Sequence, residues 1–182
     1  MTMIKKIKTL YYKFFKSGTE YARFLGVKVG DKCFISSSAH FSSEPYLIEI
    51  GSNVAITKGV MIHTHGGARV ARTYIPDFDI FGKVKICDNA YIGSGAQIMP
   101  GVTIGKGALV AGGSVVTKSI PDGVVVAGNP AKYVCTVDEY IERNAKYNVG
   151  TKGLSYEAKK KVLLAMDGNK FIQKDYIKIN SK

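Results

Sequence analysis

The chain has 182 residues, of which 46% are hydrophobic and 22% are charged, a balance that fits one globular domain and excludes a largely disordered chain. Its net charge of +12 is suited to nucleic acid, an anionic membrane or a polyanionic small molecule. No helix-turn-helix, finger or aromatic-basic module accompanies that charge, so a nucleic-acid partner is not expected.

The cysteines and the N-terminus both bear on the compartment. Cys33, Cys87 and Cys135 are odd in number and lack C-x-x-C spacing, which supports neither a disulfide framework nor a zinc site. The opening segment MTMIKKIKTLYYKFFKSG is interrupted by lysines throughout, so it lacks the apolar length of a signal peptide or a membrane span. These features predict a cytoplasmic protein that is soluble or at most attached to a surface.

Residues 1–25 are predicted to form an N-terminal amphipathic helix. Apolar side chains recur at helical spacing among the lysines, at Ile4, Ile7, Tyr11, Phe14 and Phe15. This face could pack on the rest of the protein or on a sister subunit, or it could make a peripheral contact with an anionic membrane.

Residues 26–135 carry a six-residue repeat. Every sixth position is a β-branched aliphatic in the run Ile86, Ile92, Ile98, Ile104, Val110 and Val116, the same register includes Ile50, Ile56 and Ile62, and a separate stretch contains Val29, Ile35 and Phe41. A helical period of 3.6 would scatter these positions around a helix, and strands of an ordinary sandwich would need hairpin turns, which are absent. Short strands joined by glycine corners, three to a coil, satisfy the pattern, so we predict a mainly β, parallel β-helix with the aliphatics inside.

The repeat is expected to break once, in an extended loop over residues 63–84. This segment, HTHGGARVARTYIPDFDIFGK and the residue after it, contains two histidines and two arginines. Long irregular excursions from a regular fold are usually functional, so the loop is the predicted active-site loop. Residues 136–182 are predicted to form a C-terminal helical tail, with helices over Val137–Tyr147 and Ser155–Met166.

The segment IGSGAQIMPGVTIGKGALVAGGSVVTKSIPDGVVVAGNPAK resembles the last coils of the hexapeptide-repeat acyltransferases, among them the sugar, capsule, maltose, galactoside and streptogramin O-acetyltransferases. The resemblance covers roughly residues 29–135. It implies a left-handed β-helix, a homotrimer with coenzyme A between neighbouring subunits, and transfer of an acetyl group from acetyl-CoA to a hydroxyl without a metal.

Acyl transfer to an alcohol needs a base for the hydroxyl proton, and histidine suits this role. Thr64–His65 matches the T-H motif of the family, whose histidine is the general base, so His65 is the predicted catalytic residue and His63 the runner-up. Relatives often have Asp where this chain has Gly66. A backbone carbonyl, Glu44 or Asp77 could therefore orient the imidazole. No motif pairs a serine or cysteine with a base, which favours direct attack on the thioester.

The resemblance also implies the binding residues. For acetyl-CoA they are Ser94, Ala111, Gly112, Thr117, Lys118 and Lys132, where small residues admit the pantetheine arm and lysines meet the phosphates. His63, Arg72 and Glu44 are candidates for contact with the acceptor, and Arg72 could alternatively bind a phosphate of coenzyme A.

The expected acceptor is a sugar or surface glycan, and a streptogramin antibiotic is the alternative. Two other functions stay open on this fold. A hydratase of the carbonic-anhydrase kind needs three zinc-binding histidines across a subunit interface, but His63 and His65 lie only two residues apart. A non-catalytic β-helix scaffold would not bind coenzyme A.

Overall fold

The computed structural model describes residues 3–176, and the chain divides into two compact units between Asp138 and Glu139. The first unit contains three sheets, and each sheet takes every third strand of the chain up to β12. One sheet contains β1 (Lys28–Val29), β4 (Ile48–Ile50), β7 (Val84–Ile86) and β10 (Thr103–Ile104). The second contains β2 (Phe34–Ile35), β5 (Ala55–Ile56), β8 (Tyr91–Ile92), β11 (Leu109–Val110), β13 (Val124–Ala127) and β14 (Lys132–Thr136). The third contains β3 (His40–Phe41), β6 (Met61–Ile62), β9 (Gln97–Ile98) and β12 (Val115–Val116).

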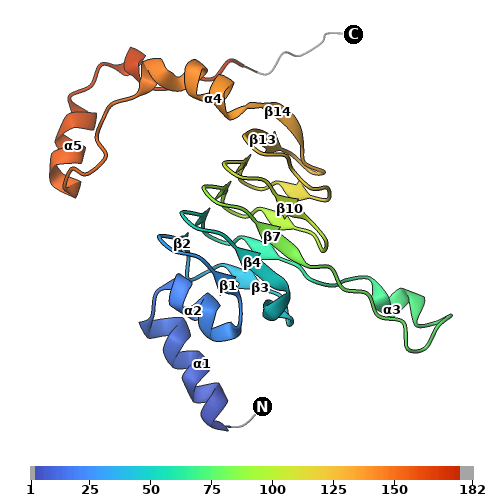
Figure 1. The fold of residues 1–182 in the computed structure, drawn as a ribbon. Helices are drawn as coiled ribbons and strands as arrows, with labels where there is room; N and C mark the ends of the chain where they lie inside the picture. Colours follow the sequence, from blue (N-terminus) through green and yellow to red (C-terminus); the bar gives the residue numbers. More distant parts are fainter. Residues whose placement is uncertain (1–2, 177–182) are drawn as a thin grey trace, which may run out of the picture. The chain divides into compact units, whose positions relative to one another are not determined.

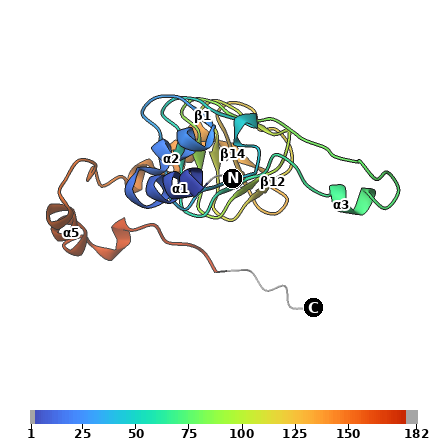
Figure 2. The same ribbon diagram turned by 90° about the horizontal axis from the view of Figure 1, so that it is seen from below.

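Three successive strands make one coil, and the coils stack on one another with parallel pairing (Figures 1 and 2). The predicted six-residue repeat is confirmed by the register, since Ile86 pairs with Ile104, Ile92 with Val110, and Ile98 with Val116. These inward side chains are all buried and form one continuous core. The left-handed sense of the coil remains a prediction.

The glycines of the corners have two separate roles. Gly105 lies so close to the next coil that an added Cβ would come within 2.4 Å of the Pro121 carbonyl carbon. Gly107 has open space around it but a φ of +63°, a conformation that L side chains rarely adopt. Asn53 and Asn89 take the same left-handed conformation at the equivalent corners of two earlier coils. Close approach and left-handed backbone thus both explain the glycine spacing.

Two helices, rather than the single one predicted over residues 1–25, precede the coils. The first is α1 (Met3–Phe15) and the second is α2 (Gly18–Leu25). Helix α2 starts anew at Ser17, which caps its N-terminus. The Ser17 hydroxyl accepts a hydrogen bond from the backbone N–H of Glu20, and the Glu20 carboxylate accepts one from the backbone N–H of Ser17. Helix α2 closes the first end of the core, with Ala22 fully buried and Gly18 against the backbone of Ile35.

The repeat is interrupted twice, not once. The expected loop runs from the end of β6 to the start of β7 and includes the short helix α3 (Ala68–Ala71). A second, shorter irregularity separates β3 from β4 and contains the 3-10 turn η1 (Pro45–Leu47). At the other end of the coils, β14 pairs antiparallel with β13 and ends the parallel stack.

The segment after β14 contains short helices joined by irregular stretches. Helix α4 (Val137–Asn144) begins before the division of the chain, and η2 (Ala145–Tyr147), α5 (Tyr156–Leu164) and η3 (Gly168–Lys170) follow in the second unit. The hydroxyl of Ser155 accepts from the Ala158 N–H and caps α5. Over residues 3–176, no helix has the length and apolarity needed to cross a bilayer.

The two glycine roles predict unequal costs for the same substitution in one corner. Gly105→Ala must push two coils apart and should lower the free energy of unfolding by about 3 kcal/mol or more. Gly107→Ala only strains the backbone and should cost about 1 to 2 kcal/mol. Urea unfolding at one protein concentration measures both. Gly107→Asn is the control, because asparagine tolerates this conformation and should cost less than alanine. Equal losses for Gly105→Ala and Gly107→Ala would contradict this assignment.

Candidate active site

The corners that follow the strands of the third sheet form one column, and the predicted catalytic histidine lies in it. Residues after β3, β6, β9 and β12 stack because their strands pair in register. The backbone N–H of Ser42 donates to the Ile62 carbonyl, that of His63 to Ile98, and that of Met99 to Val116. Both interruptions of the repeat leave from this column, one after β3 and one after β6. The fold therefore brings the irregular segments of two neighbouring coils together.

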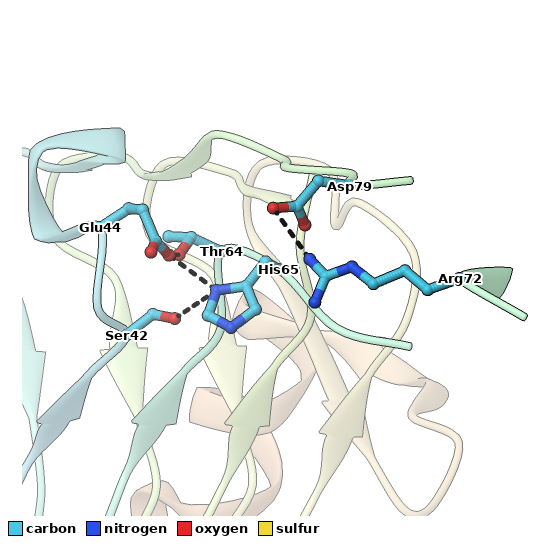
Figure 3. A network of polar contacts seen from close by, with 6 residues as sticks. All are labelled: Ser42, Glu44, Thr64, His65, Arg72 and Asp79. Atoms are coloured by element: carbon cyan, nitrogen blue, oxygen red, sulfur yellow. Dashed lines mark hydrogen bonds and ion pairs between the residues drawn. The ribbon is translucent and has the colours of Figure 1, made fainter. Parts of the chain in front are cut away.

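Glu44, from the first of these segments, contacts His65 from the second (Figure 3). Its Oε2 lies 2.7 Å from Nδ1 of His65 and also accepts from the buried hydroxyl of Thr64 at 2.8 Å. The Ser42 hydroxyl lies 3.3 Å from the same ring nitrogen. Of the three groups that could orient the imidazole, Glu44 is thus the one that the structure places against it. Asp77 has no recorded contact with the ring.

The carboxyl of Glu44 is held in its ionised form. Desolvation by partial burial is the largest single influence on its pKa and raises it, but hydrogen bonds with Thr64, His65 and Ser43 together outweigh this and lower the pKa below its usual range. An ionised carboxylate can only accept hydrogen bonds, so Nδ1 of His65 must carry the proton that it donates to Glu44.

This arrangement leaves Nε2 of a neutral His65 with a lone pair. The nitrogen points away from Glu44 and Ser42, and the side chain of His65 is 39% exposed (Figure 3). A histidine with Nδ1–H held by a carboxylate and a free Nε2 has the chemistry of a general base. The site can therefore accept a proton from a bound hydroxyl.

The long loop is anchored to the coil beside this histidine. The Gly82 N–H donates to the Thr64 carbonyl at 2.7 Å, and the Phe81 ring lies 5.8 Å from the His65 ring between centroids. Within the loop, Arg72 forms an ion pair with Asp79 at 3.3 Å and its Nε donates to the Phe78 carbonyl. Arg72 thus stabilises the loop's own shape in the structure.

Two hollows meet at His65. One is lined by Glu44 and His65 together with the loop residues Arg69, Arg72 and Asp79. The other, of about 720 Å³, is lined by His63, Met99, Pro100, Phe81 and again His65. The imidazole therefore borders two open spaces.

The runner-up histidine is placed differently. His63 lines the larger hollow, and its Nε2 lies 3.3 Å from the Gln97 amide oxygen. A neutral amide holds this ring, where a carboxylate holds His65. His40 lies exposed on β3.

The residues expected to bind acetyl-CoA fall on two corners and on the start of β14. Ser94, Ala111 and Gly112 lie together at the corner before the third sheet, where Gly113 N–H donates to the Ser94 carbonyl at 2.8 Å. Thr117 and Lys118 follow β12, in the column that contains His65, and Lys132 begins β14. Ser94, Gly112 and all three of these last residues are exposed.

Metal ligation has no counterpart in the described part of the chain. Across residues 3–176, no group of three or more His, Cys, Asp or Glu side chains is arranged to hold a metal ion.

The chain is similar in sequence to a known protein family and to a relative of nearly the same length. Residues 83–118 match the family of bacterial transferase hexapeptide proteins with six repeats. The chain is 44% identical to Protein CapG of Staphylococcus aureus over 178 residues, which cover 93% of this chain and 99% of that protein.

Two solved structures share the fold. The hexapeptide-repeat acetyltransferase VCA0836 of Vibrio cholerae, in complex with acetyl coenzyme A, has a TM-score of 0.62 and 22% identity over 72% of this chain and 84% of its own. A maltose O-acetyltransferase of Clostridium difficile has a TM-score of 0.55 and 27% identity over 73% of this chain and 84% of its own.

The hydrogen bond from Thr64 predicts how Glu44 titrates. Thr64→Val removes this donor without changing the shape of the side chain, so the pKa of Glu44 should rise toward its ordinary value. Carbon-13 NMR of the carboxyl as a function of pH measures this. Since the pKa is lower in the folded than in the unfolded chain, the ionised carboxylate stabilises the fold above the ordinary pKa, and this is lost as pH falls through the lowered one.

The matched control is Thr57→Val, the same change at a hydroxyl that donates instead to the Ile92 carbonyl at 2.7 Å. It should leave the titration of Glu44 unchanged. If Thr64→Val and the unaltered protein gave the same carboxyl titration, the hydrogen bond would not set the ionisation of Glu44.

Proposed function

The chain belongs to the hexapeptide-repeat transferase family, and on that premise we propose that it transfers an acetyl group from acetyl-CoA to a hydroxyl of a sugar or surface glycan. The observation that carries this proposal is the contact between Glu44 and Nδ1 of His65, which leaves Nε2 facing open space. A free alcohol is a poor nucleophile at neutral pH, so the reaction needs such a base.

His65 acts as the general base in the proposed reaction. Its Nε2 takes the proton of the acceptor hydroxyl while the oxygen attacks the carbonyl carbon of the thioester. The carbon–sulfur bond then breaks, and the departing thiolate of coenzyme A recovers a proton from the imidazolium. Glu44 stabilises the imidazolium between these steps and stays ionised, because its hydrogen bonds hold its pKa low.

Acetyl-CoA is the proposed donor. VCA0836, which shares the fold, was solved with acetyl coenzyme A. In this chain, exposed Ser94 and Gly112 offer a corner against which a thin pantetheine arm fits, and exposed Lys118 and Lys132 offer positive charge for the phosphates.

The proposed assembly is a homotrimer, which would complete the site. The corner with Ser94 and Gly112 and the corner with His65 stand at opposite ends of the third sheet's strands, so one copy presents the two halves on different edges. The loop also exposes apolar side chains that a neighbouring copy would cover, among them Val70, Tyr74 and Ile75. Both features support a groove between copies as the place of reaction.

A neutral hydroxyl-bearing acceptor is favoured over an anionic one. Arg72, a candidate for contact with the acceptor, is paired with Asp79 at 3.3 Å. The hollow beside His65 thus presents acids as well as bases. The similarity to a maltose O-acetyltransferase supports a sugar as the acceptor class.

Removing the base tests the mechanism. His65→Ala should lower the turnover of acetyl-CoA by about 10²- to 10⁴-fold, the usual contribution of a positioned base, while the affinity for acetyl-CoA stays nearly unchanged. Release of free coenzyme A with a panel of sugars, and slow hydrolysis of acetyl-CoA without an acceptor, measures turnover. Calorimetry measures the affinity.

His63→Ala is the matched control, since it removes an imidazole from the same corner and should be much milder. Both variants should sediment as the same trimer as the unaltered protein. Loss of activity in His63→Ala with activity retained in His65→Ala would overturn the assignment of the base. A stable and fully active monomer would overturn the proposed assembly.

A further inference from the structure

Helix α1 packs on the protein through the side that contains Thr9 and Tyr12. Only Thr9, Tyr12 and Lys16 are half-buried between Ile4 and Lys16, among the side chains that the structure describes. The Tyr12 ring stacks on Phe24 of α2, with centroids 4.2 Å apart and planes 9° apart, and Lys16 pairs with Glu20 at 3.2 Å. These contacts fix which side of α1 faces α2.

The apolar side of α1 consequently faces away from its own unit. At 100° per residue the apolar side chains of α1 other than Tyr12 fall in one continuous arc, and each of these is at least half exposed, from 50% for Tyr11 to 77% for Met3 and Phe15. The arc contains Met3, Ile4, Ile7, Leu10, Tyr11, Phe14 and Phe15. A helix normally buries such a face on its own protein, so the reversed orientation indicates an external surface.

The positive charge of α1 indicates what kind of surface its apolar arc contacts. The sequence of α1 contains four lysines and no acidic residue, and on the helical projection Lys6 and Lys8 border the two edges of the apolar arc. Lysines at both edges of an apolar face can extend their ammonium groups to lipid phosphates while their stems lie along the acyl boundary. Two copies of α1 packed face to face would instead bring like charges together without any acid to pair them.

We propose that α1 docks the protein on the surface of an anionic phospholipid bilayer, lying in the interface with its apolar arc inserted. A helix of 13 residues is too short to span the bilayer, so the contact is peripheral. This docking goes beyond the proposed acetyl transfer and does not depend on it.

A hollow beside α1 shares one residue with the hollow at the candidate base. It has a volume of about 450 Å³, and Thr9, Lys13, Ser42 and Ser43 are among the residues that line it. Ser43 also lines the hollow that contains Glu44 and His65.

Flotation of the full-length protein with vesicles tests the proposal. The vesicles contain phosphatidylcholine alone or with about one third phosphatidylglycerol. The unaltered protein should float with the anionic vesicles, less with neutral ones, and less again in high salt. The double variant Ile7→Asp and Phe14→Asp should lower the partition coefficient by about a hundredfold or more, since each buried apolar side chain contributes strongly to insertion.

The matched control carries the same charge change on α5, at Tyr156→Asp and Leu164→Asp, two side chains that are 77% and 78% exposed. It should float like the unaltered protein, and sedimentation should show one oligomeric state for all three proteins. Failure of the unaltered protein to bind anionic vesicles would overturn the proposal, as would equal loss in both double variants. A smaller oligomer on altering α1 alone would assign the face to a second copy instead.

Discussion

The burial of one aliphatic side chain in every six residues is the constraint on which the rest of the structure depends. Ile86, Ile92 and Ile98 point inward on three different sheets, and each stacks on its counterpart one coil later. This register forces the corners into columns, because a slip would turn the aliphatics outward. Residues far apart in sequence, such as Glu44 and His65, then meet at a place that the backbone ladder fixes.

The irregular segments use this regular frame. Both segments start from the same column of corners. The stacked coils therefore position them, and neither segment has to form a hydrophobic core of its own. The carboxylate of Glu44 belongs to one coil and the imidazole of His65 to the next. The end of the long loop is fixed to the coil by the hydrogen bond from the Gly82 N–H to the Thr64 carbonyl. The stack thereby holds the two groups in a fixed relation, as the proposed general-base reaction requires.

The sequence predicts the coils well and the site only in part. The six-residue period depends on local spacing, so the sequence predicts the strands and the core directly, and the T-H motif makes His65 the candidate base. Two features depended on contacts between coils. The sequence allows three groups as the partner of Nδ1, and it does not predict the supporting hydroxyls of Ser42 and Thr64. The spacing between Phe41 and Ile48 exceeds what the six-residue repeat allows, and this extra length is the sequence signal for the second irregular segment, which leaves from the same column as the loop. The sequence signal for the break between α1 and α2 is the capping pair Ser17 and Glu20, which hydrophobic periodicity alone does not reveal.

We propose that the carboxylate of Glu44 fixes the tautomer of His65 and leaves Nε2 basic. Nitrogen-15 NMR of the imidazole tests this most directly, because the two ring nitrogens have distinct shifts when one is protonated and the other is not. We expect that, once the ring is neutral, the proton of His65 resides on Nδ1 and Nε2 bears the lone pair. A neutral His65 with its proton on Nε2 would contradict this role of Glu44, since that nitrogen could not then receive the proton of an acceptor hydroxyl.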